Sequence, residues 1–341
     1  MAAYIKGAAV LSPQNTFGES GFPDEIHGYT EAGYFKCIEP QYRDFIDPMV
    51  SRRMSRIVKM GVSGALKCIK NTGIQMPDAI ITGTGMGCLE DTEKFLASIY
   101  KDNEKLLNPT PFIQSTHNTV AGAIALAIKC HNYNITYTHR GFSFESAVED
   151  TLLQLAENPS LNILTGGFDE ITDNLYSITK RLGLWRKGGI PGEGVAFFMM
   201  SGEKGEDDMS ILQAVSSFYK PEGLPAVKNQ IHRFLKDADK TMENIDLVIL
   251  GINGDFRSDK IYYQLMDSTF RNMPCIDFKH LCGEYDTASS FALWLASLIL
   301  KQQNIPAQLL QGNKVPAAMN NILIYNHLRG INHSLYLLEQ F

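Results

Sequence analysis

The hydrophobic and polar positions of the chain follow two alternating periods. Continuous apolar runs bounded by glycine or proline predict buried strands, and apolar residues at every third or fourth position predict helices that face a core. In the first part of the chain this pattern predicts strands at residues 4–11, 78–87, 134–138, 161–167 and 193–200, with helices at 51–70, 90–100, 119–130 and 143–155. Strands and helices therefore alternate, as in an α/β fold.

The rest of the chain repeats this order. Its predicted strands are residues 210–219, 245–250, 321–326 and 333–338, and its predicted helices are 226–238, 260–270 and 287–301. The polar segment 202–208 separates the two sets, so we expect an N-terminal half of residues 1–205 and a C-terminal half of residues 206–341 in one compact unit. Two tandem βαβαβαββ halves imply a five-layered α/β/α/β/α body.

The predicted helix at 287–301 is expected at the centre of this body. Its apolar residues have helical spacing, and several are small enough to allow close packing: Ala288, Phe291, Ala292, Leu295, Ala296 and Ile299. The counterpart of this helix in the first half is 143–155. We expect the two helices to pack against each other.

Residues 134–169 form the stretch around which the chain is organised, and they read strand, tight turn, helix, strand. Ser143 is expected to cap the N-terminus of the helix. A nucleophile is often carried at such a turn, because a helix N-terminus lowers the pKa of a thiol and offers N–H groups to an oxyanion. The apex of this turn is Gly141, which has no side chain.

Composition and charge argue against several classes of function. The net charge of −6 and the short basic clusters at 52–53 and 180–181 argue against nucleic-acid binding. No apolar run reaches the roughly 18 residues of a membrane span, and the N-terminus lacks a signal-peptide pattern, so a soluble, cytoplasmic protein is expected. The six scattered cysteines include no CxxC pair, so neither a zinc site nor a disulfide framework is expected.

Glycine-rich stretches recur in a fixed order along nearly the whole chain. They are Val120-Ala121-Gly122 leading to Ala147, Gly166-Gly167-Phe168-Asp169-Glu170, Gly192-Glu193-Gly194-Val195-Ala196, Gly251-Ile252-Asn253-Gly254 with Asp259, residues 279–290, and Gly330-Ile331-Asn332. In order and spacing they resemble the β-ketoacyl-ACP synthases. The resemblance implies the thiolase fold and acyl-transfer chemistry.

The same resemblance marks positions where the family's catalytic residues are missing. It places the family's nucleophilic cysteine at Gly141 and its two histidines at Gly251 and Glu284. The family's serine falls on Ser143 and its next glycine on Phe144, which we expect to shorten or block the acyl tunnel. The family's gating loop is replaced by Asn326-His327-Leu328-Arg329-Gly330, so Leu328 is a candidate pocket residue.

These departures predict the loss of condensing activity. The family's reaction needs an acyl thioester on a nucleophile, and Gly141 cannot hold an acyl group. Two neutral imidazoles stabilise the enolate in the family, whereas a carboxylate at Glu284 would repel the developing negative charge. Glu284 is either a general base or, as the favoured alternative, part of a structural ion pair with Lys279 or His280.

Three further residues are candidates for relocated chemistry. His139 and Arg140 could bind a carboxylate or phosphopantetheine, but structural hydrogen bonds or a role at an interface is the favoured interpretation. Cys282 could be a replacement nucleophile, although a free cysteine is more often a small buried hydrophobe. The sequence therefore leaves open whether the chain is an enzyme.

Some ketosynthases that build polyketides or aryl polyenes pair with a homologue that lacks the nucleophile, called a chain-length factor, and the chain resembles such a partner. The first hypothesis is therefore a non-catalytic subunit of a fatty-acid, polyketide or aryl-polyene-type pathway. It would pair with an active ketosynthase, or with itself when isolated, through the strand at 134–138. Chain-length factors commonly carry glutamine at the lost cysteine, and Gly141 departs from that pattern.

The second hypothesis is a self-sufficient 3-oxoacyl-ACP synthase or acyltransferase whose chemistry has moved to Glu284, His139 or Cys282. Under either hypothesis the acyl groups would be held on the phosphopantetheine of an acyl carrier protein. We expect no cofactor or metal bound to the chain itself. An intact ketosynthase encoded beside this chain would favour the first hypothesis.

Overall fold

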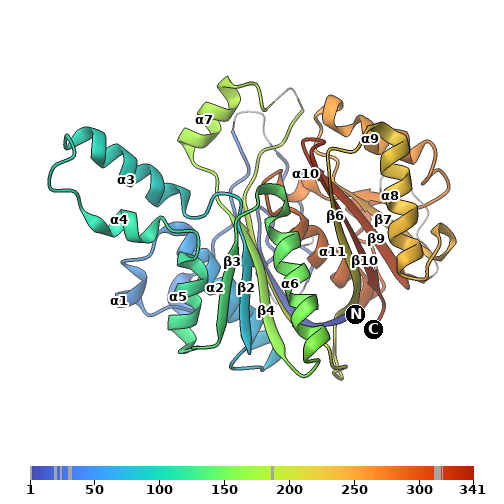
Figure 1. The fold of residues 1–341 in the computed structure, drawn as a ribbon, viewed down its shortest axis with the longest axis horizontal. Coiled ribbons are helices and arrows are strands. Elements are labelled where there is room, and N and C mark those ends of the chain that lie inside the picture. The colour runs from blue at the N-terminus through green and yellow to red at the C-terminus, as the bar shows by residue number, and fades with distance from the viewer. Residues whose placement is uncertain are drawn as a thin grey trace.

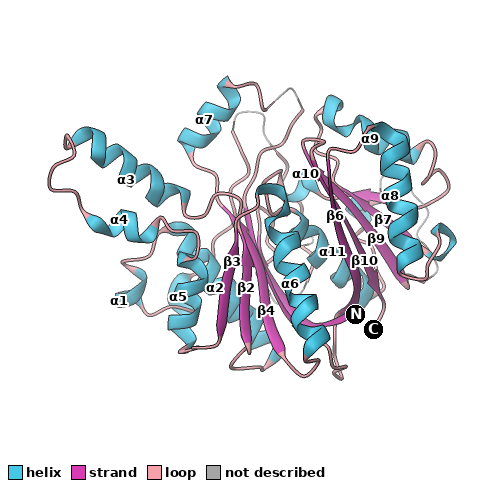
Figure 2. Cartoon of the chain, viewed as in Figure 1, coloured by secondary structure: helices cyan, strands magenta, loops and turns pink. Residues whose placement is uncertain are grey.

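The computed structural model describes residues 2–18, 21–23, 25–29, 33–185, 188–310, 316 and 318–341. The strands in these residues form one mixed, ten-stranded sheet in the order β3-β2-β4-β5-β1-β6-β10-β9-β7-β8. They are β1 (Ala3–Leu11), β2 (Ala79–Gly83), β3 (Tyr133–Tyr137), β4 (Asn162–Asp169), β5 (Gly194–Ser201), β6 (Ser210–Tyr219), β7 (Leu247–Leu250), β8 (Cys275–Asp277), β9 (Asn321–Leu328) and β10 (Asn332–Glu339). Figure 2 shows the strands in magenta with helices in cyan packed around them.

The sheet consists of two halves with the same internal order. Counted inward from each end, the order is β3-β2-β4-β5-β1 in the first half and β8-β7-β9-β10-β6 in the second. In each half the fourth strand inward runs antiparallel to its neighbours, while the outer three are parallel. A short antiparallel pairing of β1 with β6, at Ala3–Leu212 and two further residue pairs, joins the halves.

The α-helices of the described residues are α1 (Pro48–Ser51), α2 (Arg56–Thr72), α3 (Leu89–Lys101), α4 (Pro109–Gln114), α5 (Thr119–Ile128), α6 (Ser143–Glu157), α7 (Asp173–Arg181), α8 (Gly223–Asp237), α9 (Phe256–Met266), α10 (Lys279–Cys282) and α11 (Ser289–Gln302). The 3₁₀ turns are η1 (Tyr42–Asp44), η2 (Arg140–Phe142), η3 (Met242–Asn244) and η4 (Ala307–Leu309).

The helices cover the two half-sheets in layers (Figure 1). Helices α2 and α5 pack on the outer face of the first half-sheet, and α8 and α9 on the outer face of the second. Helices α6 and α11 lie between the half-sheets and share one hydrophobic core with both. The arrangement confirms the predicted five-layered α/β fold of two tandem halves. The boundary proposed near residue 205 stays a prediction.

Helix α11 is the most deeply buried helix of the body. Every residue from Ser289 to Leu300 is buried, and the helix contacts strands of both half-sheets as well as α6. Phe291 packs in the same core as Ala147 and Val148 of α6. The predicted central packing of these two helices is therefore confirmed.

Several element boundaries differ from the sequence-based prediction. The helix predicted at 51–70 is divided, because α1 ends at Ser51 and α2 begins only after Ser55, which has an extended backbone. The helix predicted at 260–270 begins earlier, because the Asp255 side chain accepts a hydrogen bond from the Arg257 N–H and caps α9. Helices α1, α4, α7 and α10 and strand β8 were not predicted, and each is short.

Among the residues that the structure describes, no helix has the length and apolar content needed to cross a bilayer.

Candidate functional site

The turn at Gly141 is formed by η2 between β3 and α6. The Ser143 hydroxyl donates a hydrogen bond to the Arg140 carbonyl (2.7 Å) and accepts one from the His139 N–H (2.8 Å). Ser143 is the first residue of α6, and the N-cap position is held by Phe142. The prediction that Ser143 is the N-cap is wrong, because its hydroxyl closes the preceding turn instead.

The space beside Gly141 is filled by the tip of the β9–β10 hairpin. A Cβ atom at Gly141 would lie 2.9 Å from both Cβ and Cδ2 of Leu328 and 3.1 Å from Cβ of Asn332. Real Cβ atoms rarely have neighbours this close, because interiors are packed to contact. A side chain at Gly141 would therefore displace the hairpin.

The space beside Gly251, at the end of β7, is occupied as well. A Cβ atom there would lie 2.3 Å from Oδ1 of Asn326 and 2.7 Å from the hydroxyl of Tyr262. The Tyr262 hydroxyl also accepts a hydrogen bond from the His327 N–H (2.8 Å). Asn326 and Tyr262 thus hold the volume into which any side chain at position 251 would project.

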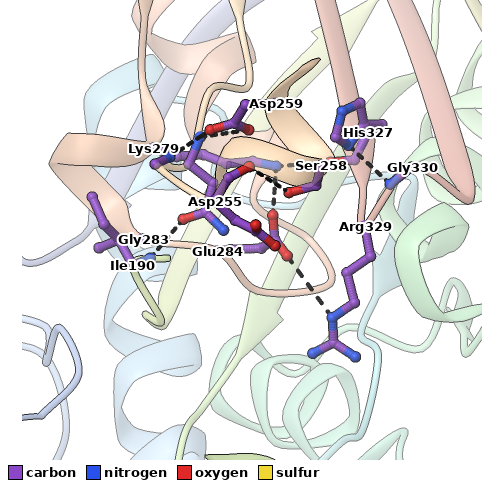
Figure 3. A network of polar contacts seen from close by, with 12 residues as sticks. Ile190, Asp255, Ser258, Asp259, Lys279, Gly283, Glu284, His327, Arg329 and Gly330 are labelled. Atoms are coloured by element: carbon purple, nitrogen blue, oxygen red, sulfur yellow. Dashed lines mark hydrogen bonds and ion pairs between the residues drawn. The ribbon is translucent and has the colours of Figure 1, made fainter. Parts of the chain in front are cut away.

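Glu284 belongs to a buried network of polar groups (Figure 3). Its Oε2 lies 3.1 Å from the Lys279 ammonium, and both side chains are at most 3% exposed. Lys279 also donates to the His327 carbonyl (2.8 Å), and Nε of Arg329 lies 3.9 Å from the other Glu284 oxygen. The predicted ion pair with Lys279 is confirmed, whereas His280 lies beside Asp277 (3.1 Å).

Asp259 anchors the loop that follows β7. Its carboxylate accepts hydrogen bonds from the backbone N–H groups of Asn253 (3.1 Å) and Gly254 (2.6 Å). Burial raises its pKa to about 6, against the opposing effect of these bonds. The carboxylate of Asp259, in the following helix α9, therefore fixes the backbone of this loop.

The remaining predicted residues divide between the core and the surface. Cys282 is fully buried, and burial raises the pKa of its thiol, as expected for a small hydrophobe. Phe144 is also fully buried and packs against Phe198 and Tyr336. His139 is exposed, and its role in structural hydrogen bonds or at an interface stays a prediction.

Arg140 extends from the turn toward the segment after Glu284. Its guanidinium lies 3.7 Å from the Asp286 carboxylate. The backbone of Arg140 is in the left-handed region (φ 52°), which is uncommon for a residue with a side chain. The pair therefore links the turn before Gly141 to the start of α11.

A cavity of about 500 Å³ lies beside the Arg140–Asp286 pair and Glu284. Its lining includes Arg140, Glu284, Leu328, Arg329 and Asn332. Its lining also includes an apolar wall, which consists of Leu175 and Ile178 of α7 and of Leu182, Leu184 and Trp185 just after this helix. This wall was not predicted, because α7 is short and its apolar residues are half-buried or exposed.

Two further carboxylates line the cavity and were also missed as site residues. Asp169 accepts hydrogen bonds from the Gly85 N–H (2.8 Å) and from the N–H and hydroxyl of Thr287 (2.9 and 2.8 Å). Burial, with the nearby charge of Asp286, raises the pKa of Asp169 to about 7. Burial likewise raises the pKa of Glu170 to about 7.

The cavity has no arrangement suited to metal binding. Within the described ranges, no three or more His, Cys, Asp or Glu side chains are grouped so that they could hold a metal ion. The described geometry offers ion-pair and hydrogen-bond partners for a polar ligand and an apolar wall for a hydrocarbon chain. It offers no accessible thiol, because all six cysteines are buried.

Several solved structures have the same fold as this chain. The ishigamide ketosynthase/chain length factor superposes with a TM-score of 0.78 at 15% identity, covering 100% of this chain and 99% of that chain. A ketosynthase (ApeO) in complex with its chain length factor (ApeC) from Xenorhabdus doucetiae gives 0.77 at 16% identity, with 100% and 98% covered. A β-ketoacyl synthase from Burkholderia phymatum STM815 gives 0.74 at 13% identity, with 99% of each chain covered.

At the level of sequence, a search of curated proteins gave no match. A family model does match: the N-terminal domain of β-ketoacyl synthases covers residues 33–206, about half of the chain. That range includes the turn at Gly141, α6 and the strands β2 to β5. The chain belongs to the β-ketoacyl synthase family.

Proposed function

We propose that the chain is a catalytically silent, ketosynthase-like subunit that acts as a chain-length-factor-like partner of an active ketosynthase. The observation that carries this proposal is the turn at Gly141. Position 141 has no side chain, and Leu328 and Asn332 fill the space a nucleophile would need. Without a nucleophile in this turn, the acyl thioester of the condensing reaction cannot form there.

The two other altered positions support the same proposal. Enolate stabilisation needs hydrogen-bond donors aimed at the developing oxyanion. Gly251 has no donor side chain, and the space beside it is occupied by Asn326 and Tyr262. Glu284 is an acceptor held by Lys279. Since members of a catalytic unit act together, losing all three groups removes condensation.

The known structures of similar fold support a paired assembly. One is a ketosynthase in complex with its chain length factor, and another is a type II polyketide ketosynthase with its acyl carrier protein. We therefore propose that this chain pairs with a ketosynthase through β3 and works beside an acyl carrier protein in a fatty-acid, polyketide or aryl-polyene-type pathway.

The alternative, a self-sufficient acyltransferase, has less support. A relocated nucleophile needs an accessible group with a lowered pKa. Cys282 is fully buried, and burial raises the pKa of its thiol. Glu284 is paired with Lys279, and the printed hydrogen bond of His139 comes from its backbone N–H, which donates to the Ser143 hydroxyl. None of the three forms a nucleophile–base pair with another.

The test is acylation of the purified chain. We expect no stable mass increase after incubation with acyl-ACP or acyl-CoA, measured by intact-mass spectrometry. The positive control is an intact β-ketoacyl synthase, assayed alone and after co-expression with this chain. A covalent acyl adduct on this chain that disappears in Cys282→Ala would overturn the proposal and favour the acyltransferase.

A further inference from the structure

The two ends of the ten-stranded sheet differ in exposure. At one end, β8 has only three residues, and Cys275 and Ile276 are buried. At the other end, β3 pairs with β2, and no described strand pairs with its outer edge. Tyr133, its first residue, is 48% exposed. An open strand edge of this kind is a template for pairing with another chain.

The helices on both faces of β3 extend this edge with apolar surface. Leu126 of α5 is 83% exposed, and Leu153 of α6 is 68% exposed. Figure 1 shows α5 and α6 on opposite faces of the sheet at β3. An edge strand flanked by exposed leucines indicates a protein partner that continues the sheet and covers both helices.

Asp150 of α6 contacts this edge strand. Asp150 of α6 accepts hydrogen bonds from the Tyr133 hydroxyl (3.4 Å) and from the Gln154 amide (3.2 Å). After burial, the charge of Asp150 is the largest cause that raises the pKa of Tyr137 to about 12. Tyr133 and Tyr137 are the two ends of β3, so Asp150 lies near its middle. In the described structure Asp150 makes no ion pair.

The other charges of α6 have the same sign. Residues 143–157 include no lysine, arginine or histidine, and their charged residues are all acidic: Glu145, Glu149, Asp150 and Glu157. Two copies that pair isologously about β3 run antiparallel, with a two-fold axis near its middle residue, Ile135. A pair with that symmetry would bring α6 beside its own copy and the two Asp150 carboxylates close to the axis. Like charges placed together in an interface disfavour association.

We propose that Asp150 selects the partner at the β3 edge. It disfavours a second copy of this chain and favours a subunit of the same fold whose corresponding helix carries a lysine or arginine near the axis. The inference rests on the proposed function, since it takes the partner to be a related subunit. Beyond that function, the inference specifies that the partner's helix carries a positive charge opposite Asp150.

Sedimentation of the purified full chain tests the selection against self-pairing. Asp150→Asn keeps the acceptor for Tyr133 and removes the charge. We expect it to self-associate about tenfold more tightly than the natural chain at low salt. The difference should shrink at about 0.5 M salt, where charges are screened within a few ångströms. Glu157→Gln, the same charge change at the end of α6, is the matched control and should have a smaller effect.

Two outcomes would overturn the inference. One is a tight homodimer of the natural chain at low salt, and the other is equal self-association of Asp150→Asn and the natural chain. Unfolding of each variant, followed by circular dichroism, verifies that the fold is kept. The sedimentation test needs no ketosynthase, so its failure leaves the silent-subunit proposal standing. Conversely, acylation of the chain would refute the silent-subunit proposal without altering the sedimentation result.

Discussion

Gly141→Cys tests whether the missing thiol alone accounts for the altered site. The new Cβ would lie 2.9 Å from Cβ and Cδ2 of Leu328 and 3.1 Å from Cβ of Asn332. The Cβ of Leu328 is fixed to the backbone of β9 and cannot rotate away, so the hairpin must move. Overpacking of this kind costs about 1–3 kcal/mol of unfolding free energy.

Matched variants separate the steric effect from the chemical one. Gly141→Ala adds the same Cβ without a thiol, so its loss of stability in denaturant unfolding should be close to that of Gly141→Cys. Adding Leu328→Ala should recover part of the loss caused by the new Cβ, compared with Leu328→Ala alone. If Gly141→Cys is as stable as the natural chain, the steric reasoning is wrong.

Restoring the thiol should not restore condensation. A cysteine at this helix N-terminus would have a lowered pKa, so slow acylation by a reactive thioester is expected. The enolate would still lack two donors, and loss of one oxyanion donor costs on the order of 100-fold or more in rate. Gly251→His would collide with Asn326, so adding it with Glu284→His should not help. The assay is malonyl-ACP decarboxylation and β-ketoacyl product for each variant. Condensation by Gly141→Cys at the rate of an intact ketosynthase would refute the silent-subunit proposal.

Two further predictions concern buried charges. Lys279→Met leaves Glu284 without its close partner, so it should cost about 3–5 kcal/mol of unfolding free energy. Lys279→Met with Glu284→Gln should cost less than the single change, and an equal or larger loss would contradict a stabilising pair. Burial raises the pKa of Glu170 from 4.5 to about 7, so the folded state binds its proton more tightly than the unfolded state. Its contribution to stability is present below pH 4.5 and is lost as the pH rises through about 7. Lowering the pH from about 8 to 6 should therefore raise the Tm of the natural chain. The rise should be smaller in Glu170→Gln. An identical rise in this variant would assign the effect to other groups, such as Asp169.

The alternation of strands and helices was predictable because it depends on local periodicity. The long apolar run of α11 and the repeated order of elements in the two halves were enough to predict the layers. The pair of Lys279 with Glu284 was also predictable, since only five positions separate these residues in the sequence. Short elements such as α7 were not, because nine residues with exposed apolar positions give little periodic signal.

The filling of the altered site could not be predicted from the sequence. Gly141 contacts Leu328 and Asn332, which lie about 190 positions further along the chain. Such contacts depend on how the second half packs on the first and on the path of the β9–β10 hairpin. The departure of residues 326–330 from the family's gating loop marked Leu328 as a candidate pocket residue. No local pattern indicates that its side chain lies against Gly141. The same holds for Asp286, whose pairing with Arg140 joins two segments of different halves.

The three altered positions are linked through one hairpin. Leu328 and Asn332 fill the space at Gly141, Asn326 fills the space at Gly251, and the His327 carbonyl accepts from Lys279, the partner of Glu284. All four hairpin residues lie within residues 326–332, so each position constrains the path of the same segment. A side chain restored at one position moves the hairpin and disturbs the packing at the others. Under the silent-subunit proposal, restoring the three side chains one at a time would therefore pass through destabilised variants.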